Sequence, residues 1–118
     1  MDSTCFNLTI ENNIAQLTLN RPEKRNSMIP EFWDELPQII RRIDQESLAR
    51  VIVISSTGPH FTSGIDISVF ESSKKKKVDH EKQQELNRVA GAKLYDTVQY
   101  QQQTFSCLEE SRIPILVA

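Results

Sequence analysis

The chain has 118 residues, of which 38% are hydrophobic and 25% charged, a balance typical of a folded globular domain and not of a disordered or fibrous chain. Its net charge of −2 gives no electrostatic reason to expect nucleic acid as a partner. No apolar run approaches the roughly 20 residues of a membrane span, so we expect no membrane partner either.

The first residues predict a β-hairpin. Apolar and polar residues alternate over residues 6–10 and again over residues 15–19, which is the pattern of half-buried strands. Asn12 and Asn13 lie between the two segments, and asparagine tolerates the left-handed backbone that a tight hairpin turn needs.

A helix is expected from Pro30 onwards. Proline suits the first helical turn, and apolar residues recur at steps of three and four from Phe32 to Ile43, so they share one face. Pro37 interrupts this pattern, because it cannot donate to the carbonyl of Trp33 and its ring clashes there, at a cost of about 3 kcal/mol in a regular helix interior. We therefore predict a kink or a break near residues 33–36.

The rest of the chain predicts two buried strands and a long helix. Residues 51–54 form a continuous β-branched run, typical of a strand covered on both faces in a parallel sheet. Apolar residues at helical spacing over residues 86–108 predict an amphipathic helix, and residues 115–118 begin another buried strand. Because an exposed apolar strand is rare at a natural terminus, we expect the polypeptide to be a fragment.

Residues 71–80 differ in character from the segments around them. They lack apolar periodicity and contain four consecutive lysines, Lys74–Lys77. We interpret them as a solvated, mobile insertion within a single domain that spans residues 1–118.

The cysteines and histidines predict neither a redox centre nor a metal site. Cys5 and Cys107 lie far apart and outside any C-x-x-C motif, so we expect two buried thiols in a reducing compartment and no disulfide. His60 and His80 lack companions at metal-ligand spacing, so no metal is expected.

Two short segments are the candidates for chemistry. They are residues 19–27, with the sequence LNRPEKRNS, and residues 61–67, with the sequence FTSGIDI. The second follows a buried strand, so Gly64-Ile65-Asp66 is expected to open a helical turn whose unpaired N–H groups suit a negative oxygen. Gly64 would let a ligand approach the backbone closely. The alternative is an ordinary glycine turn with Asp66 as its N-cap.

The order of these features resembles that of the crotonase (enoyl-CoA hydratase/isomerase) superfamily over nearly the whole chain. The shared features are the hairpin, an L-N-R-P-x-x-x-N-[AS] loop, a helix, a buried strand, an F-x-x-G-x-D motif, a long helix and a P-x-[IL]-x-A strand. The resemblance implies an α/β fold, the amino-terminal part of the crotonase ββα spiral. Within the family, the F-T-x-G-I-D form and the lengthened segment before His80 look most like the Δ3,5-Δ2,4-dienoyl-CoA isomerases.

The resemblance also implies a site for an acyl-CoA thioester. In the family the loop after the hairpin contacts the CoA nucleotide, and Arg25, Asn26 and Ser27 occupy the matching positions. Arg25 is the candidate for contact with the phosphates or the adenine side. The first oxyanion donor of the family is the backbone N–H between Gly and Asp, which here belongs to Ile65. The other residues that would line the thioester are Ser63, Gly64, Asp66 and Ile67.

For the whole protein, the resemblance implies that a C=C bond is shifted or hydrated through a thioester enolate. CoA would enter as part of the substrate, with no other cofactor and no metal. A homo-oligomer, trimer or hexamer, is implied for the full-length protein. The expected compartment is the cytoplasm, with the mitochondrion or peroxisome as the alternative in a eukaryote.

The family places its catalytic carboxylates and its second oxyanion donor after the P-x-[IL]-x-A strand. We therefore expect the 118 residues alone to be poorly stable and inactive. One alternative is that the protein is a non-catalytic, truncated CoA-binding module or a partner subunit. A separate alternative concerns Lys74–Lys77, which could reach the CoA phosphates as flexible point charges.

Overall fold

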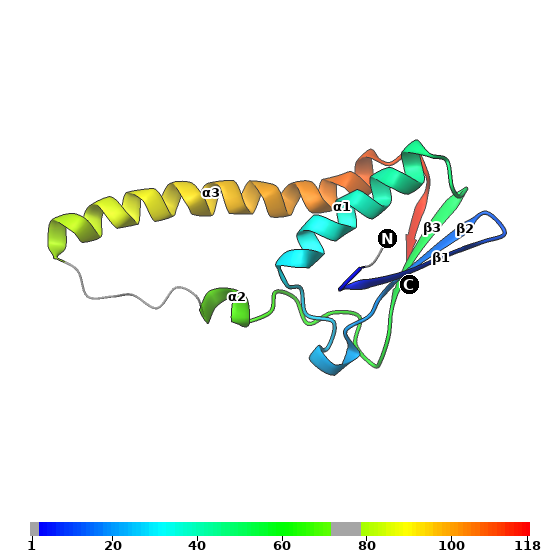
Figure 1. The fold of residues 1–118 in the computed structure, drawn as a ribbon, viewed down its shortest axis with the longest axis horizontal. Coiled ribbons are helices and arrows are strands. Elements are labelled where there is room, and N and C mark those ends of the chain that lie inside the picture. Colours follow the sequence, from blue (N-terminus) through cyan, green and yellow to red (C-terminus); the bar gives the residue numbers. More distant parts are fainter. Residues whose placement is uncertain (1–2, 72–78) are drawn as a thin grey trace.

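The structure is a computed structural model that describes residues 3–71 and 79–118 of the chain (Figure 1). Strands and helices alternate after an opening hairpin. The elements in chain order are β1 (Phe6–Glu11), β2 (Ile14–Leu19), the single-turn 3-10 helix η1 (Pro22–Lys24), α1 (Pro30–Gln45), β3 (Val51–Ser56), α2 (Ser68–Glu71), α3 (His80–Glu110) and β4 (Ile115–Val117).

The predicted hairpin is confirmed. β1 and β2 pair antiparallel, with Phe6 opposite Leu19 at one end and Glu11 opposite Ile14 at the other. Asn12 and Asn13 form the turn with φ values of 51° and 64°. Two consecutive left-handed residues give the turn the right-handed twist that the flanking strands need.

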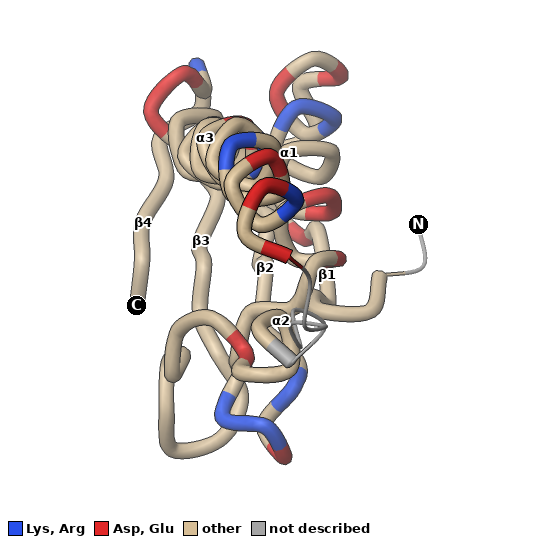
Figure 2. The backbone as a smooth tube through the Cα atoms, turned by 90° about the vertical axis from the view of Figure 1, so that its left-hand side faces the viewer, with Lys and Arg blue, Asp and Glu red and all other residues tan. Residues whose placement is uncertain are grey.

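The four strands form one sheet in the order β1-β2-β3-β4. β2 pairs parallel with β3, and β3 pairs parallel with β4. Parallel neighbours need a crossover connection, and α1 makes the first crossover while α3 lies on the second. Both helices cover the same face of the sheet (Figures 1 and 2). The sequence prediction of an α/β architecture in this order is confirmed.

The core lies between that sheet face and the two helices. Leu17 and Ile52 have no exposed surface, and the apolar face of α1 packs on them through residues such as Ile40 and Ile43. Burial of each such side chain contributes about 1.5–3 kcal/mol to folding.

The opposite face of the sheet is left open by this one-sided covering. Val51 and Val53 of β3 are only half-buried, so the expected covering on both faces is met on one face alone. The strand predicted at residues 115–118 is present as β4, but the prediction that it is buried is wrong, because Leu116 and Val117 are 59% and 63% exposed. β4 is an edge strand, and no helix of the described chain covers its second face.

Pro37 does not break α1, so of the kink or break predicted near residues 33–36 the break is excluded. The helix continues from Pro30 to Gln45. Pro37 lacks the N–H that would bond to the carbonyl of Trp33, and the hydroxyl of Thr104 on α3 donates to that carbonyl instead, at 3.1 Å. A partner from another helix therefore satisfies the acceptor that proline leaves open.

The helix α3 begins earlier than the apolar pattern predicts. Asp79 caps it by accepting a hydrogen bond from the N–H of Lys82 at 2.9 Å, which is a favourable N-cap arrangement. Only its last turns reach the core, where the rings of Phe105 and Phe32 lie 6.1 Å apart. Its first half projects from the body of the molecule (Figure 1). Most of the predicted insertion at residues 71–80 lies outside the described residues.

Both cysteines are buried and neither forms a disulfide, as predicted. Burial raises the pKa of the Cys5 thiol to about 11, and the neighbouring Glu35 carboxylate adds to this effect. Burial also raises the pKa of Cys107. Because the thiolate is the reactive form, neither cysteine is suited to nucleophilic chemistry.

Candidate active-site turn

The two segments singled out in the sequence lie side by side. The N–H of Ser63 donates to the carbonyl of Arg25 at 3.0 Å, and the N–H of Met28 donates to the carbonyl of Gly64 at 2.8 Å. The N–H of Asp66 donates to the carbonyl of Met28 at 2.8 Å. The loop after β2 and the segment after β3 are thus joined along their backbones.

This pairing fixes the direction of the Ile65 peptide groups. Met28 and Ile65 form a parallel bridge, and Met28 bonds to the residues on both sides of Ile65. In a parallel pair the bridged residue turns its own N–H and C=O away from that partner. Among the residues that the structure describes, the N–H of Ile65 donates to no protein acceptor.

The backbone at Gly64 is left-handed, with φ of +90°, which glycine adopts at no steric cost. A Cβ built at this position meets nothing within 4 Å, so the space beside the turn is open. The predicted helical turn forms, but it starts at Asp66, whose carbonyl accepts from the N–H of Val69 at 3.1 Å, and α2 begins at Ser68. Ile65 lies before this turn, so it is the bridge to Met28 that leaves its N–H without an acceptor among the described residues.

Asn26 ties the loop to the end of β3. Its side chain is 3% exposed, and its Oδ1 accepts from the N–H of Arg21 at 2.8 Å. Its Nδ2 donates to the carbonyls of Thr57 and His60 at 2.8 and 3.0 Å. The amide is therefore fully used inside the protein, and its role here is to hold the loop in place.

Ser27 and Asp66 join the two segments through their side chains. The Ser27 hydroxyl donates to Asp66 Oδ2 at 2.6 Å, and the N–H of Ser68 donates to Asp66 Oδ1 at 2.9 Å. These two hydrogen bonds, followed in importance by the nearby Arg21 guanidinium, hold the pKa of the Asp66 carboxyl well below its usual range. Asp66 thus also bonds to the start of α2, in keeping with the simpler capping interpretation.

Arg21 belongs to the same network, although the sequence analysis gave it no role. Its Nη1 donates to the carbonyl of Ser27 at 2.6 Å, and its Nη2 lies 4.0 Å from Asp66 Oδ2. The only sequence signal was its position within the N-R-P segment. Its partner Asp66 is 45 residues further along the chain, so local pattern could not reveal the pair.

The remaining predicted residues face solvent. Arg25 is exposed and has left-handed backbone with φ of 54°, an uncommon conformation for a long side chain. Lys24 beside it is also exposed. Ser63 and Ile67 are exposed on the second segment.

An apolar cavity of about 120 Å³ lies behind the turn. It is placed at the carboxyl ends of the parallel strands, where ligands bind in open α/β sheets. Its lining includes Leu19, Met28, Ile54, Phe61, Thr62 and Phe105. Thr62 belongs to the second segment, and Met28 is the residue that bonds to Gly64 and Asp66, so the cavity and the turn adjoin.

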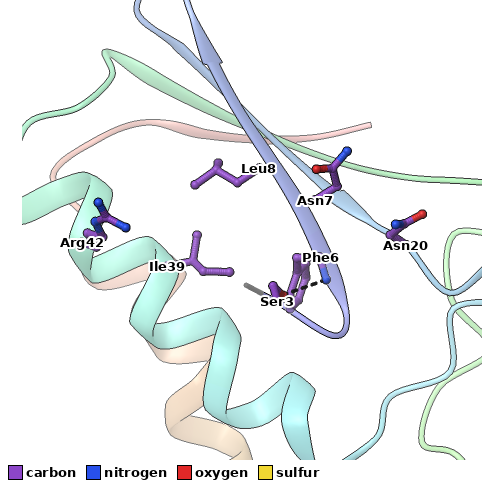
Figure 3. A pocket seen from close by; sticks show the side chains of 7 residues that line it. All are labelled: Ser3, Phe6, Asn7, Leu8, Asn20, Ile39 and Arg42. Carbon is purple, nitrogen blue, oxygen red and sulfur yellow. Dashed lines mark hydrogen bonds between the residues drawn. The ribbon is translucent and has the colours of Figure 1, made fainter. Parts of the chain in front are cut away.

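A second pocket, of about 360 Å³, lies between β1 and α1 (Figure 3). Leu8 and Ile39 face each other across it, and Ser3 lies beside Phe6, whose N–H donates to its hydroxyl at 3.0 Å. Arg42, the charged residue in its lining, forms an ion pair with Glu46, with 3.6 Å between Nε and Oε1. None of the residues from the two paired segments lines this pocket except Asn20, and we assign it no function.

Within residues 3–71 and 79–118, no three His, Cys, Asp or Glu side chains gather in a group that could hold a metal ion. In the same part of the chain, no helix has the length and apolar character needed to cross a membrane.

Comparison with known proteins identifies the family. The sequence profile of the enoyl-CoA hydratase/isomerase family matches residues 9–100. The chain belongs to this family. The match includes both paired segments, so the predicted resemblance to the crotonases is confirmed.

Two curated relatives of this enoyl-CoA hydratase/isomerase chain show how far the similarity extends. It is 33% identical over 108 residues to the mitochondrial Δ(3,5)-Δ(2,4)-dienoyl-CoA isomerase of Rattus norvegicus, which covers 92% of this chain and 32% of the relative. It is 38% identical over 61 residues to the hydroxycinnamoyl-CoA hydratase-lyase of Pseudomonas fluorescens, which covers 52% of this chain and 22% of the relative. The chain therefore spans about a third or less of the length of these relatives.

Solved structures confirm the crotonase-like fold. A Thermobifida fusca protein assigned to the enoyl-CoA hydratases, in complex with CoA, superposes with a TM-score of 0.71 at 30% identity, over 96% of this chain and 40% of that one. An enoyl-CoA hydratase of Mycobacterium smegmatis superposes with a TM-score of 0.76 at 20% identity, over 98% of this chain and 40% of that one.

Proposed function

We propose that the intact protein binds an acyl-CoA and shifts or hydrates a C=C bond of its acyl chain, with the Ile65 N–H as one donor of an oxyanion hole. The observation that carries the proposal is the outward-facing N–H of Ile65, which has no acceptor among the described residues. Family membership supports the acyl-CoA substrate class. We propose no resident metal or cofactor, since CoA enters as part of the substrate.

The chemistry needs a fixed hydrogen-bond donor where negative charge develops. When a proton leaves the acyl chain, the thioester carbonyl becomes an enolate oxygen, and a preorganised N–H stabilises that charge without having to reorganise. The Ile65 N–H meets this need because the hydrogen bonds at Met28 hold its neighbours on both sides. The absence of a side chain at Gly64 leaves room for the thioester to approach.

The CoA and acyl parts of the substrate have separate candidate regions. Arg25 is exposed beside the turn, and its guanidinium suits a phosphate group. Asn26 and Ser27 would support binding by holding that loop, because their side chains are buried and hydrogen-bonded. The apolar cavity behind Met28 and Thr62 would receive part of the acyl chain, with Ser63 and Ile67 at its approach.

Isomerisation is the favoured reaction within the family. The match to the dienoyl-CoA isomerase of Rattus norvegicus runs over 92% of the chain, whereas the match to the hydratase-lyase runs over 52%. We assign no acid or base, because Asp66 is held in a charged hydrogen-bonded state and a general base needs a pKa near the working pH.

Calorimetric titration of octanoyl-CoA, with free CoA as the control ligand, tests the proposal. Ile65→Pro removes the backbone donor, whereas the matched variant Ile65→Ala shortens the side chain and keeps the N–H. We expect Ile65→Ala to bind octanoyl-CoA as the wild type does, and Ile65→Pro to bind it at least about tenfold more weakly. Equal binding by the two variants would remove the oxyanion assignment.

The role of Arg25 is tested in the same titrations. Arg25→Asn removes the charge while suiting the left-handed backbone, so that a loss of binding would not reflect a misfolded loop. We expect both octanoyl-CoA and free CoA to bind about three- to tenfold more weakly, because the lost contact is to the nucleotide that they share. Unchanged binding of both ligands would separate Arg25 from the CoA site.

A further inference from the structure

Three polar side chains, two from the loop after β2 and one from the segment after β3, are joined by hydrogen bonds and an ion pair next to the Ile65 turn. Arg21 follows β2, Ser27 precedes α1, and Asp66 precedes α2. Arg21 and Asp66 are each only 16% exposed at their side chains. We propose that Arg21 is a positioning residue of this site, which holds the loop at Ser27 and offsets the charge of Asp66, the residue that follows Ile65. This inference rests on the proposed function of that N–H.

Arg21 contacts both sides of the bridge that orients Ile65. Through Nη1 it holds the carbonyl of Ser27, the residue before Met28, at 2.6 Å. Through Nη2 it approaches Asp66 Oδ2, on the residue after Ile65, at 4.0 Å. A planar guanidinium can reach two such groups at once, whereas a lysine ammonium is a single point charge.

The charge of Asp66 gives this arrangement a functional consequence. Asp66 follows Ile65 directly, and the short hydrogen bond from Ser27 keeps its carboxylate ionised. An unbalanced negative charge on the residue next to an oxyanion donor would oppose the partial negative charge of a bound thioester oxygen, and more strongly that of the enolate. The guanidinium of Arg21 offsets that charge from the protein side of the turn.

Arg21 differs in this respect from the exposed Arg25. The hydrogen bond to Ser27 and the approach to Asp66 already use two of the guanidinium nitrogens of Arg21 inside the protein. We therefore expect Arg21 to influence thioester binding through the turn and not by contact with CoA.

The test compares Arg21→Gln, Arg21→Lys, and Arg21→Gln combined with Asp66→Asn in titrations with octanoyl-CoA and free CoA. We expect Arg21→Gln to weaken octanoyl-CoA binding about tenfold and to leave free CoA binding unchanged. The combined variant, which removes both charges, should recover most of that loss. Arg21→Lys, which keeps the positive charge but reaches only one of the two groups, should bind octanoyl-CoA more tightly than Arg21→Gln and more weakly than the wild type. A purely structural role would weaken both ligands equally and would show no recovery in the combined variant, which would overturn the inference.

A ligand-free measurement separates this inference from the proposed function. Amide hydrogen exchange at Met28 and Asp66, whose N–H groups form the bridge, should be at least about tenfold faster in Arg21→Gln, while the core amides of Ile52 and Ile54 keep wild-type rates. If the wild type does not bind octanoyl-CoA, the proposed function fails and these rates alone decide whether Arg21 holds the turn. Unchanged rates at Met28 and Asp66 would overturn that as well.

Discussion

Asp66 is a carboxylate whose surroundings favour its charged form. The Ser27 hydroxyl and the Ser68 N–H donate to its two oxygens, and these bonds lower its pKa in the folded protein, with Arg21 contributing less. A group with a lowered folded pKa stabilises the protein above its unfolded pKa, about 3.9 for aspartate. That contribution is lost as the pH falls through the folded pKa.

The pH dependence of unfolding should therefore change in the variant Asp66→Asn. We expect the variant to be less stable than the wild type at pH 7, and the difference to shrink below about pH 4, where the wild-type carboxylate also begins to lose its advantage. Urea unfolding between pH 3 and pH 7 measures this. The exposed Asp96→Asn on α3 is the matched control. A difference between Asp66→Asn and the wild type that is the same at both ends of the range would contradict the expected role of its charge.

Glu35 will contribute to the loss of stability at low pH in both the wild type and the Asp66→Asn variant. Burial raises its pKa, but hydrogen bonds from the Ser3 hydroxyl and from the N–H groups of Cys5 and Thr4 outweigh burial and lower the pKa overall. Its two oxygens accept these bonds at 2.5 to 3.0 Å and tie the first residues to α1. The comparison between Asp66→Asn and the wild type removes this shared background.

At the scale of elements, α1 and α3 depend on each other at one buried point. Pro37 leaves the Trp33 carbonyl without a partner in its own helix, and the buried Thr104 hydroxyl on α3 donates to it at 3.1 Å. An unsatisfied buried acceptor costs about 1–3 kcal/mol, so this contact helps to hold the two helices at one register.

A double-mutant cycle tests this dependence. We expect Thr104→Val to lower the free energy of unfolding by about 1–2 kcal/mol in the wild type. The loss should be smaller in the Pro37→Ala background, because the N–H of alanine can then bond to Trp33, which gives a coupling energy of about 1 kcal/mol. Thr97→Val, whose hydroxyl bonds within exposed α3, should show no coupling to position 37. Additive effects of Thr104→Val and Pro37→Ala in urea unfolding would contradict the exchange of partners.

The spacing of apolar residues in the sequence was enough to predict those elements whose structure depends mainly on their own residues. The hairpin with Asn12-Asn13, the apolar face of α1 and the β-branched run of β3 were all predictable in this way. Prediction failed where distant partners decide the outcome. Thr104, 71 residues from Trp33, makes Pro37 tolerable, and the bridge to Met28 places Ile65 before the helical turn and not within it.

The candidate site shows the same division. The paired motifs were recognisable by sequence, because the residues of each motif are contiguous. The roles within them were not, since the bonds of Asn26 reach Thr57 and His60, and those of Arg21 reach Asp66. Long-range contacts of this kind leave no trace in local composition.

The molecule as a whole is elongated. Its radius of gyration is 17.6 Å and its extents are 61 × 30 × 22 Å, whereas a compact chain of this length has a radius of gyration of about 13–14 Å. The projecting half of α3 accounts for the difference (Figure 1). Every residue from 84 to 100 is exposed, and these include Leu86 and Leu94, at 51% and 64%.

A helix without tertiary contacts relies on its own marginal stability. We therefore expect amides in residues 86–98 to exchange at least about tenfold faster than those in residues 104–108, whose turns pack on the core. Hydrogen-exchange mass spectrometry on overlapping peptides measures the gradient. Gly91 offers a matched variant, because a Cβ there meets nothing within 4 Å. Gly91→Ala should slow exchange about fivefold in residues 86–98, through helix propensity alone, and leave residues 104–108 unchanged.

Uniform protection along α3 would contradict this expectation. It would mean that the face carrying Leu86 and Leu94 is covered in solution. Dilution then distinguishes the causes, because protection by a second copy of the chain falls with protein concentration, whereas protection from within one chain does not. A stable interface buries roughly 800 Å² on each partner. Because every residue from 84 to 100 is exposed, such an interface would slow amide exchange most in the projecting half of α3.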